Sequence, residues 1–233
     1  MRTMITIYFD KEYYRWAPLL IRSLEINSPK IGIHVHGVNL TRVQLRELKA
    51  FKNVKKVSAY EIPHDPEISY EFAFQMIERK AYFFRKTFDL FSEADLYILM
   101  DVDTLVVNPL NKLEKIMESY DMAGVMTNPE KIMGGFLAVK NKAVTKAYWK
   151  ELDDFLMDGG GFYYNKDQPA IFRLYKKYAD QIKFLGLGFE YLNIWSKNDR
   201  NIYVWSAHKL EYGDKDFRYE LYKEKLEEME GKK

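Results

Sequence analysis

The chain has 233 residues, of which 47% are apolar and 16% aromatic, a composition typical of a globular protein with a sizeable core. The 36 Lys and Arg residues nearly balance 34 Asp and Glu residues, which argues against a general nucleic-acid-binding protein. The sequence contains no cysteine, which excludes disulfides, thiolate metal sites and cysteine nucleophiles. Asp10 interrupts the N-terminus before a signal-peptide core could form, and no apolar run is as long as a membrane span. We therefore expect a cytoplasmic protein without a transmembrane segment.

Strand-like and helix-like patterns alternate along almost the whole chain. The predicted elements, in chain order, are a strand at Met4–Phe9, a helix at Pro18–Ile26, a strand at Ile31–Val38, a helix from the capping box of Thr41 and Gln44 to Phe51, a strand at Val54–Ile62, a helix at Glu71–Phe91, a strand at Leu96–Met100, a short helix near Pro109, strands at Met122–Met126 and Phe136–Val139, helices at Val144–Leu156 and Gln168–Tyr178, strands at Lys183–Leu187 and Ile202–Ser206, and a charged helix at about 214–230.

This alternation predicts an α/β fold with a mainly parallel central sheet and helices on both faces. No linker-like composition divides the chain, so we expect one domain over residues 1–233. In such folds ligands bind beyond the carboxyl ends of the strands. Candidate functional residues should therefore follow the predicted strands.

An acidic pair follows the most hydrophobic predicted strand. Leu96–Met100 runs directly into Asp101-Val102-Asp103. Two carboxylates this close repel each other unless a cation lies beside them, and hard oxygen ligands suit Mg²⁺ or Mn²⁺, which can also bridge the oxygens of a diphosphate. A second Asp-x-Asp, Asp214-Lys215-Asp216, has no strand before it, and we interpret it as a solvated helix start.

Phosphatases of the haloacid-dehalogenase type also place Asp-x-Asp after a buried strand. Their pattern requires one more residue between the second Asp and Thr104, and their later acidic pair follows a strand, whereas Asp153-Asp154 lies in a predicted amphipathic helix. The spacing excludes this alternative.

Several further motifs occur in the order found in GT-A nucleotide-sugar transferases. The sequence resembles this group, and most closely glycosyltransferase family 8, the glycogenin and lipopolysaccharide galactosyltransferase group. The segments that carry the resemblance are Tyr8–Tyr13, Tyr97–Val106, Met133–Asn141, Asp167-Gln168, Phe189–Asn193 and Ser206–Lys209. In one departure, Met133 stands where the family has an asparagine that lines the sugar pocket.

The resemblance implies a role for each matching residue. A divalent ion, Mn²⁺ or Mg²⁺, would be held by Asp101, Asp103 and His208. The two residues beside the reacting sugar would be Asp167 and Gln168. Contacts to the nucleotide sugar would come from Tyr8, Asp10, Tyr13, Lys80, Arg85, Asp101, Val102, Gly134, Gly135 and Lys209.

The function implied is metal-dependent transfer of a sugar from a nucleotide-diphosphate sugar, a UDP-sugar above all, to a hydroxyl of a glycan, lipid or protein acceptor. The family's retaining chemistry would place Gln168 near the anomeric carbon, whereas Asp167 could serve as the base of an inverting enzyme, so the stereochemistry stays open. Two alternatives are a non-catalytic binder of nucleotide or sugar and a sugar-phosphate nucleotidyltransferase. The intact acidic pair argues against the first, and the lack of glycine in Phe9-Asp10-Lys11-Glu12 argues against the second.

Overall fold

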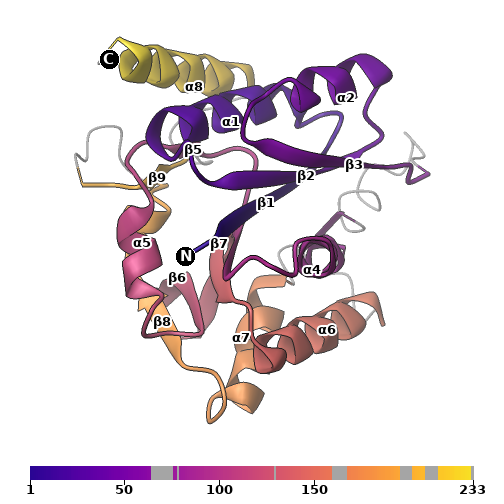
Figure 1. Cartoon of the computed structure of the whole chain (residues 1–233), viewed down its shortest axis with the longest axis vertical. Coiled ribbons are helices and arrows are strands. Elements are labelled where there is room, and N and C mark those ends of the chain that lie inside the picture. The colour runs from indigo at the N-terminus through magenta and orange to yellow at the C-terminus, as the bar shows by residue number, and fades with distance from the viewer. Residues whose placement is uncertain are drawn as a thin grey trace.

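The computed structural model describes residues 1–63, 76–77, 79–128, 130–158, 167–194, 201–207 and 215–231. In these residues the central sheet has seven strands in the order β3-β2-β1-β4-β7-β6-β8 (Figure 1). Its strands are β1 Thr3–Asp10, β2 Gly32–Val38, β3 Val54–Tyr60, β4 Leu96–Met100, β6 Met122–Asn128, β7 Lys131–Lys140 and β8 Phe184–Leu187. A small separate sheet pairs β5, Leu105–Val106, with β9, Val204–Trp205.

The helices are α1 Ala17–Asn27, α2 Arg42–Lys49, α4 Lys80–Leu90, α5 Asn111–Ile116, α6 Ala143–Met157, α7 Asp167–Tyr178 and α8 Lys215–Glu230, with short 3-10 turns η1 Tyr14–Trp16 and η3 Phe189–Tyr191. Figure 1 shows α1, α2 and α8 on one side of the sheet and α4, α6 and α7 on the other. No helix in the described part of the chain is long and apolar enough to cross a membrane.

The sheet is mainly parallel, and one strand is reversed. Strands β3, β2, β1 and β4 pair in parallel, and β6 pairs in parallel with β8. Between them β7 pairs antiparallel with both β4 and β6, because the short link from β6 to β7 allows only a hairpin. The predicted fold class is confirmed. The reversal also brings the first half of β7 to the carboxyl end of β4, where Met100 pairs with Phe136.

Alternate side chains of β4 build two cores, as the period of two of a strand requires. Leu96, Ile98 and Met100 join the core under α1 and α8, whereas Tyr97 and Leu99 join the core under α4, α6 and α7. A strand buried on both faces must be apolar at every position, which explains the uninterrupted run in the sequence.

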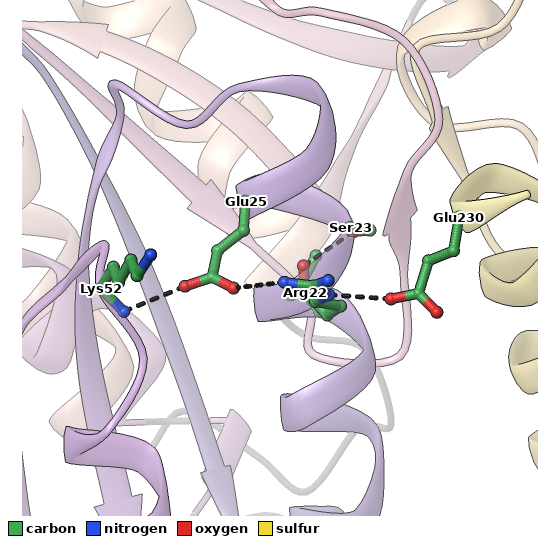
Figure 2. A network of polar contacts seen from close by, with 6 residues as sticks. Arg22, Ser23, Glu25, Lys52 and Glu230 are labelled. Atoms are coloured by element: carbon green, nitrogen blue, oxygen red, sulfur yellow. Dashed lines mark hydrogen bonds and ion pairs between the residues drawn. The ribbon is translucent and has the colours of Figure 1, made fainter. Parts of the chain in front are cut away.

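Helix α8 packs on α1 next to the strand ends. Figure 2 shows Arg22 of α1 between Glu25 and Glu230, the second of which lies on α8. The Arg22 Nε donates to Glu230 Oε1 at 2.8 Å, and the backbone N–H of Lys52 donates to Glu25 Oε1 at 3.0 Å. The ion pair between Arg22 and Glu230 is exposed, so it contributes little stability, and burial of Tyr222 and its neighbours in the core holds α8 more strongly.

Three predicted elements differ from the structure. The predicted strand Ile202–Ser206 is reduced to β9, and it pairs with β5 outside the central sheet because β5 offers a free edge just after the acidic pair. The helix predicted at Glu71–Phe91 is described as α4 from Lys80 onward, and most of its predicted first turns lie outside the described residues. The strand predicted at Phe136–Val139 extends back to Lys131, which places the glycine pair inside β7.

Candidate active site

Charged side chains from three elements meet at the carboxyl end of β4. Lys80 is the first residue of α4, Asp101 directly follows β4, and Asp167 is the first residue of α7. The Lys80 Nζ lies 2.9 Å from Asp101 Oδ1 and 3.5 Å from Asp167 Oδ2. We call Lys80, Asp101 and Asp167 the carboxylate–lysine cluster. It lies where α/β proteins bind their ligands.

Lys80 keeps its charge although its side chain is only 9% exposed. Burial alone would lower the pKa of Lys80, but the carboxylates of Asp101 and Asp167 raise it above its ordinary value. Tyr8, near the end of β1, belongs to the same surroundings. Burial first, and then Asp101 and Asp167, raise the pKa of Tyr8, so its hydroxyl stays protonated and can donate a hydrogen bond.

The glycine pair of β7 makes room for the two carboxylates. A Cβ on Gly135 would lie 2.6 Å from Asp101 Oδ2, closer than real Cβ contacts come. A Cβ on Gly134 would overlap Asp167 Oδ2 and lie 3.1 Å from Lys80 Nζ. Because neighbouring strand residues face opposite sides, one glycine serves each carboxylate. Any larger residue at either position would displace the cluster.

The turn that carries Asp103 is held by its backbone. The Thr104 hydroxyl donates to the carbonyl oxygen of Asp101 at 2.7 Å, and the Ser206 hydroxyl donates to the carbonyl oxygen of Asp103 at 3.0 Å. The hydroxyl of Tyr222 donates to that same Asp103 oxygen. Burial, followed by the neighbouring charge of Asp101, raises the pKa of the Asp103 carboxyl to about 6.

The predicted nucleotide contacts lie at the end of β1. Asp10 Oδ1 accepts the backbone N–H groups of Glu12 and Tyr13 at 2.9 and 3.1 Å. Burial raises the pKa of Asp10, and these two hydrogen bonds oppose the rise. The ammonium of Lys215 lies 4.7 Å from the centre of the Tyr13 ring and 3.8 Å from the Glu12 carboxylate. The first turn of α8 therefore lies beside Tyr13. Helix α8 begins at Lys215, and the side chains of Lys215 and Asp216 are exposed, as expected for a solvated helix start.

Arg85 is not brought to the cluster. Its guanidinium makes an ion pair of 2.8 Å with Asp153 of α6, and its Nε donates to the same oxygen at 2.9 Å. The structure thus places Lys80, rather than Arg85, beside the acidic pair. His208, Lys209 and Asp214 lie outside the described residues, and within the described ones no three His, Asp or Glu side chains form a group that could hold a metal.

The remaining predicted residues lie near the cluster along the chain. Val102 is buried between the two aspartates, and its side chain faces the core under α1 and α8. Gln168 follows Asp167 in the first turn of α7, and its Oε1 is buried without a hydrogen-bond partner among the described residues. Lys215, Arg218 and Tyr222 of α8 also belong to the surroundings of the site, and the charge of Arg218 opposes the rise in the pKa of Asp103. These residues could not be found from the sequence, because a charged C-terminal helix carries no local sign of which strand end it will cover.

No protein-family model matches the chain, and no curated protein matches it in sequence. Solved structures do match. The crystal structure of the glycosyltransferase GlyE from Streptococcus pneumoniae TIGR4 aligns with a TM-score of 0.61 and 12% identity, over 98% of this chain and 63% of that one. The apo form of GlyE aligns with a TM-score of 0.59 and 11% identity, over 100% and 64%. This chain has a glycosyltransferase fold. It spans less than two thirds of the length of the GlyE chains.

Proposed function

We propose that this protein transfers a sugar from a nucleoside-diphosphate sugar, a UDP-sugar above all, to a hydroxyl group of an acceptor, with the help of Mn²⁺ or Mg²⁺. The observation that carries the proposal is the carboxylate–lysine cluster, with Asp103 two residues away, at the carboxyl end of β4 in a glycosyltransferase fold. Charged groups lose their hydration when they are buried, so a cluster of this kind contributes little to the stability of the fold. A role in binding accounts for it better. The family-8 resemblance adds the assignment of individual residues.

The residues present fit a divalent cation. Asp101 Oδ1 is bonded to Lys80, whereas Asp101 Oδ2 faces the space above Gly135. Burial, followed by the charge of Asp101, raises the pKa of Asp103, and a bound cation would stabilise the ionised carboxylate against both. Carboxylate oxygens are the ligands that Mg²⁺ and Mn²⁺ prefer. When bound, the ion would supply positive charge that stabilises the departing nucleoside diphosphate.

His208 is proposed as the third metal ligand and Lys209 as a phosphate contact. They follow Ala207, whose backbone N–H donates to the Tyr222 hydroxyl at 3.0 Å, and that hydroxyl is bonded to the Asp103 carbonyl. Ala207 is therefore tied to the acidic turn, and this supports the proposal.

At the nucleotide end, the Tyr13 ring would stack on the base and Asp10 would hydrogen-bond to it. Asp10 Oδ1 already accepts hydrogen bonds from the backbone of Glu12 and Tyr13, so Oδ2 is the oxygen that would accept a hydrogen bond from a base. Because Lys215 lies over the Tyr13 ring, a stacked base requires the Lys215 side chain to swing aside. Its ammonium would then be close to the phosphates.

At the sugar end, Asp167 would bind the sugar hydroxyls, and Lys80 would hold the carboxylates of Asp101 and Asp167 in place through its two ion pairs. In the reaction, the acceptor oxygen bonds to the anomeric carbon, the bond from that carbon to the phosphate oxygen breaks, and the acceptor proton must leave. The Oε1 of Gln168, which is buried without a hydrogen-bond partner in the part of the chain that the structure describes, would face the reacting carbon in a retaining enzyme. Asp167 would take the proton in an inverting one.

The test measures UDP binding by calorimetry with Mn²⁺ and with excess chelator, and then UDP release from a panel of UDP-sugars. We expect binding only with metal, because the diphosphate and the carboxylates otherwise repel each other. Asp103→Asn should abolish metal-dependent binding and UDP release without unfolding the protein. Asp154→Asn, which alters an exposed ion pair with Lys150 on α6, is the matched control and should change neither.

Two results would separate the alternatives. UDP binding that is equal with chelator and unaffected by Asp103→Asn would refute the proposal. Metal-dependent UDP binding without UDP release from any donor, with or without added sugar acceptors, would instead favour a non-catalytic binding protein.

A further inference from the structure

Tyr222 joins three separate segments at one point behind the acidic turn. This α8 residue is 1% exposed, and its hydroxyl donates to the carbonyl oxygen of Asp103. The same hydroxyl lies 3.1 Å from the Ser206 hydroxyl and accepts the backbone N–H of Ala207 at 3.0 Å. One oxygen thus connects α8, the end of β9 and the turn after β4.

The small sheet explains why these segments meet. Leu105 of β5 pairs with Trp205 of β9, so Asp103 and Ala207 each lie two residues beyond that pair on opposite strands. The backbones of these two residues have left the ladder, and the Tyr222 hydroxyl bonds to both of them. The Tyr222 ring is itself fixed against Trp205, with ring centroids 4.9 Å apart. The hydroxyl therefore takes the place of the next rung of the ladder.

The Tyr222 hydroxyl acts as both a donor and an acceptor of hydrogen bonds. A tyrosine hydroxyl has one proton to donate and can accept further hydrogen bonds, and here it donates to Asp103 and accepts from Ala207. Removing the hydroxyl would leave the Ala207 N–H without its partner and would free the Asp103 backbone on one side.

From this geometry we infer that Tyr222 is a positioning residue: its hydroxyl fixes the Asp101–Asp103 turn so that the two carboxylates can bind one divalent cation together. This inference rests on the proposed function, which supplies the cation. Residues that orient metal ligands without touching the metal typically change metal affinity by about 10- to 100-fold when they are altered. Such a residue need not contact the sugar donor or the acceptor.

Tyr222→Phe tests the inference, because it removes one oxygen and keeps the ring against Trp205. The matched control is Tyr148→Phe, which removes a fully buried hydroxyl that donates to the Ile171 carbonyl at 2.7 Å in the other core. Calorimetry gives the Mn²⁺ dissociation constant of each protein without any substrate, and thermal unfolding gives its melting temperature. Both variants should lose a similar amount of melting temperature. Only Tyr222→Phe should weaken Mn²⁺ binding, by about tenfold.

Ser206→Ala is a second variant, since it removes the other hydroxyl bonded to the Asp103 carbonyl, and it should weaken Mn²⁺ binding in the same direction. It keeps the test decisive if Tyr222→Phe does not fold. Wild-type Mn²⁺ affinity in a folded Tyr222→Phe protein, or equal weakening by Tyr148→Phe, would overturn the positioning role while leaving the proposed function intact. If the wild-type protein itself bound no Mn²⁺, the metal-dependent function would fail and this inference with it.

Discussion

Acid should destabilise this protein through two buried histidines on β2. His34 and His36 are fully buried, with ring centroids 3.9 Å apart. His34 Nδ1 and His36 Nε2 lie 2.9 and 3.0 Å from the same atom, the Thr87 Oγ1 of α4. Burial, with a further contribution from Lys56 on β3, lowers the pKa of His34 to about 4. Burial, His34 and Lys56 lower the pKa of His36 to about 2.

Acid lowers the free energy of unfolding because the two histidines bind protons at a higher pH in the unfolded protein than in the folded one. An unfolded histidine titrates near pH 6.5, and these two stay neutral in the folded protein until the pH is far lower. Below about pH 6 these two histidines therefore bind two more protons in the unfolded state than in the folded state, so their contribution to the free energy of unfolding falls by about 2.7 kcal/mol per pH unit. Between pH 7 and 5.5 the loss is about 2.5 kcal/mol, a large part of a typical stability of about 5–15 kcal/mol.

Urea denaturation followed by circular dichroism at pH 7.0, 6.0, 5.5 and 5.0 measures the pH dependence of the free energy of unfolding. The difference between the wild-type protein and His36→Gln isolates the contribution of His36. The variant should lose about 1.4 kcal/mol per pH unit less than the wild-type protein between pH 6 and 5. Asp103 titrates in the same window with the opposite sign, because its pKa is raised and its contribution to stability is lost as the pH rises through about 6. It is present in both proteins, so it cancels in the difference. Parallel curves for the two proteins would refute the reasoning.

Two further predictions concern the cluster. Gly135→Ala should weaken Mn²⁺ binding at least tenfold in calorimetry, because the added Cβ would displace Asp101 Oδ2. The control is Gly186→Ala on β8, where the added Cβ would meet only a flexible methionine side chain, and this variant should bind Mn²⁺ normally. Lys80→Met should reduce UDP release from the donor at least tenfold in a coupled assay. Arg85→Met should instead lower the melting temperature, because it leaves the buried Asp153 on α6 unpaired, and it should retain UDP release. If Arg85→Met lost UDP release and Lys80→Met did not, the donor contact would belong to Arg85.

The parts of the fold that follow from local pattern could be predicted. An apolar run such as Leu96–Met100 fits only a strand covered on both faces, and the alternation of elements then implies a mainly parallel sheet. The capping box of Thr41 and Gln44 is present, with helix α2 starting at Arg42. The position of Asp101 at a strand end also follows from the sequence, because it comes directly after this apolar run. The carboxyl ends of strands are where such folds bind ligands.

The parts that depend on contacts between distant segments could not be predicted. Lys80 and Arg85 both lie on α4, and only the packing of α4 decides that Lys80 meets Asp101 and Arg85 meets Asp153. Tyr222 lies 119 residues from Asp103, and no local pattern indicates that its hydroxyl bonds to that turn. Nothing in the sequence indicates that Gly134 and Gly135 leave room for carboxylates on the two sides of β7, because those carboxylates come from other elements.

The charge balance of the site explains why a divalent cation and α8 should both be needed. The buried ammonium of Lys80 pairs with the carboxylates of Asp101 and Asp167. Two further aspartates lie at the same edge of the sheet, Asp10 at the end of β1 and Asp103 just after β4, so this edge is acidic. A nucleoside diphosphate adds further negative charge, and one lysine cannot offset both. Among the described residues, additional positive charge comes from the first turn of α8. There Lys215 opposes the rise in the pKa of Asp10, and Arg218 opposes the rise in the pKa of Asp103. These contacts still leave negative charge in excess, and a divalent cation held by Asp101 and Asp103 would lie between the excess carboxylates and the phosphates. The same helix that supplies this charge also carries the hydroxyl that holds the Asp103 turn, so displacing α8 should weaken donor and metal binding together.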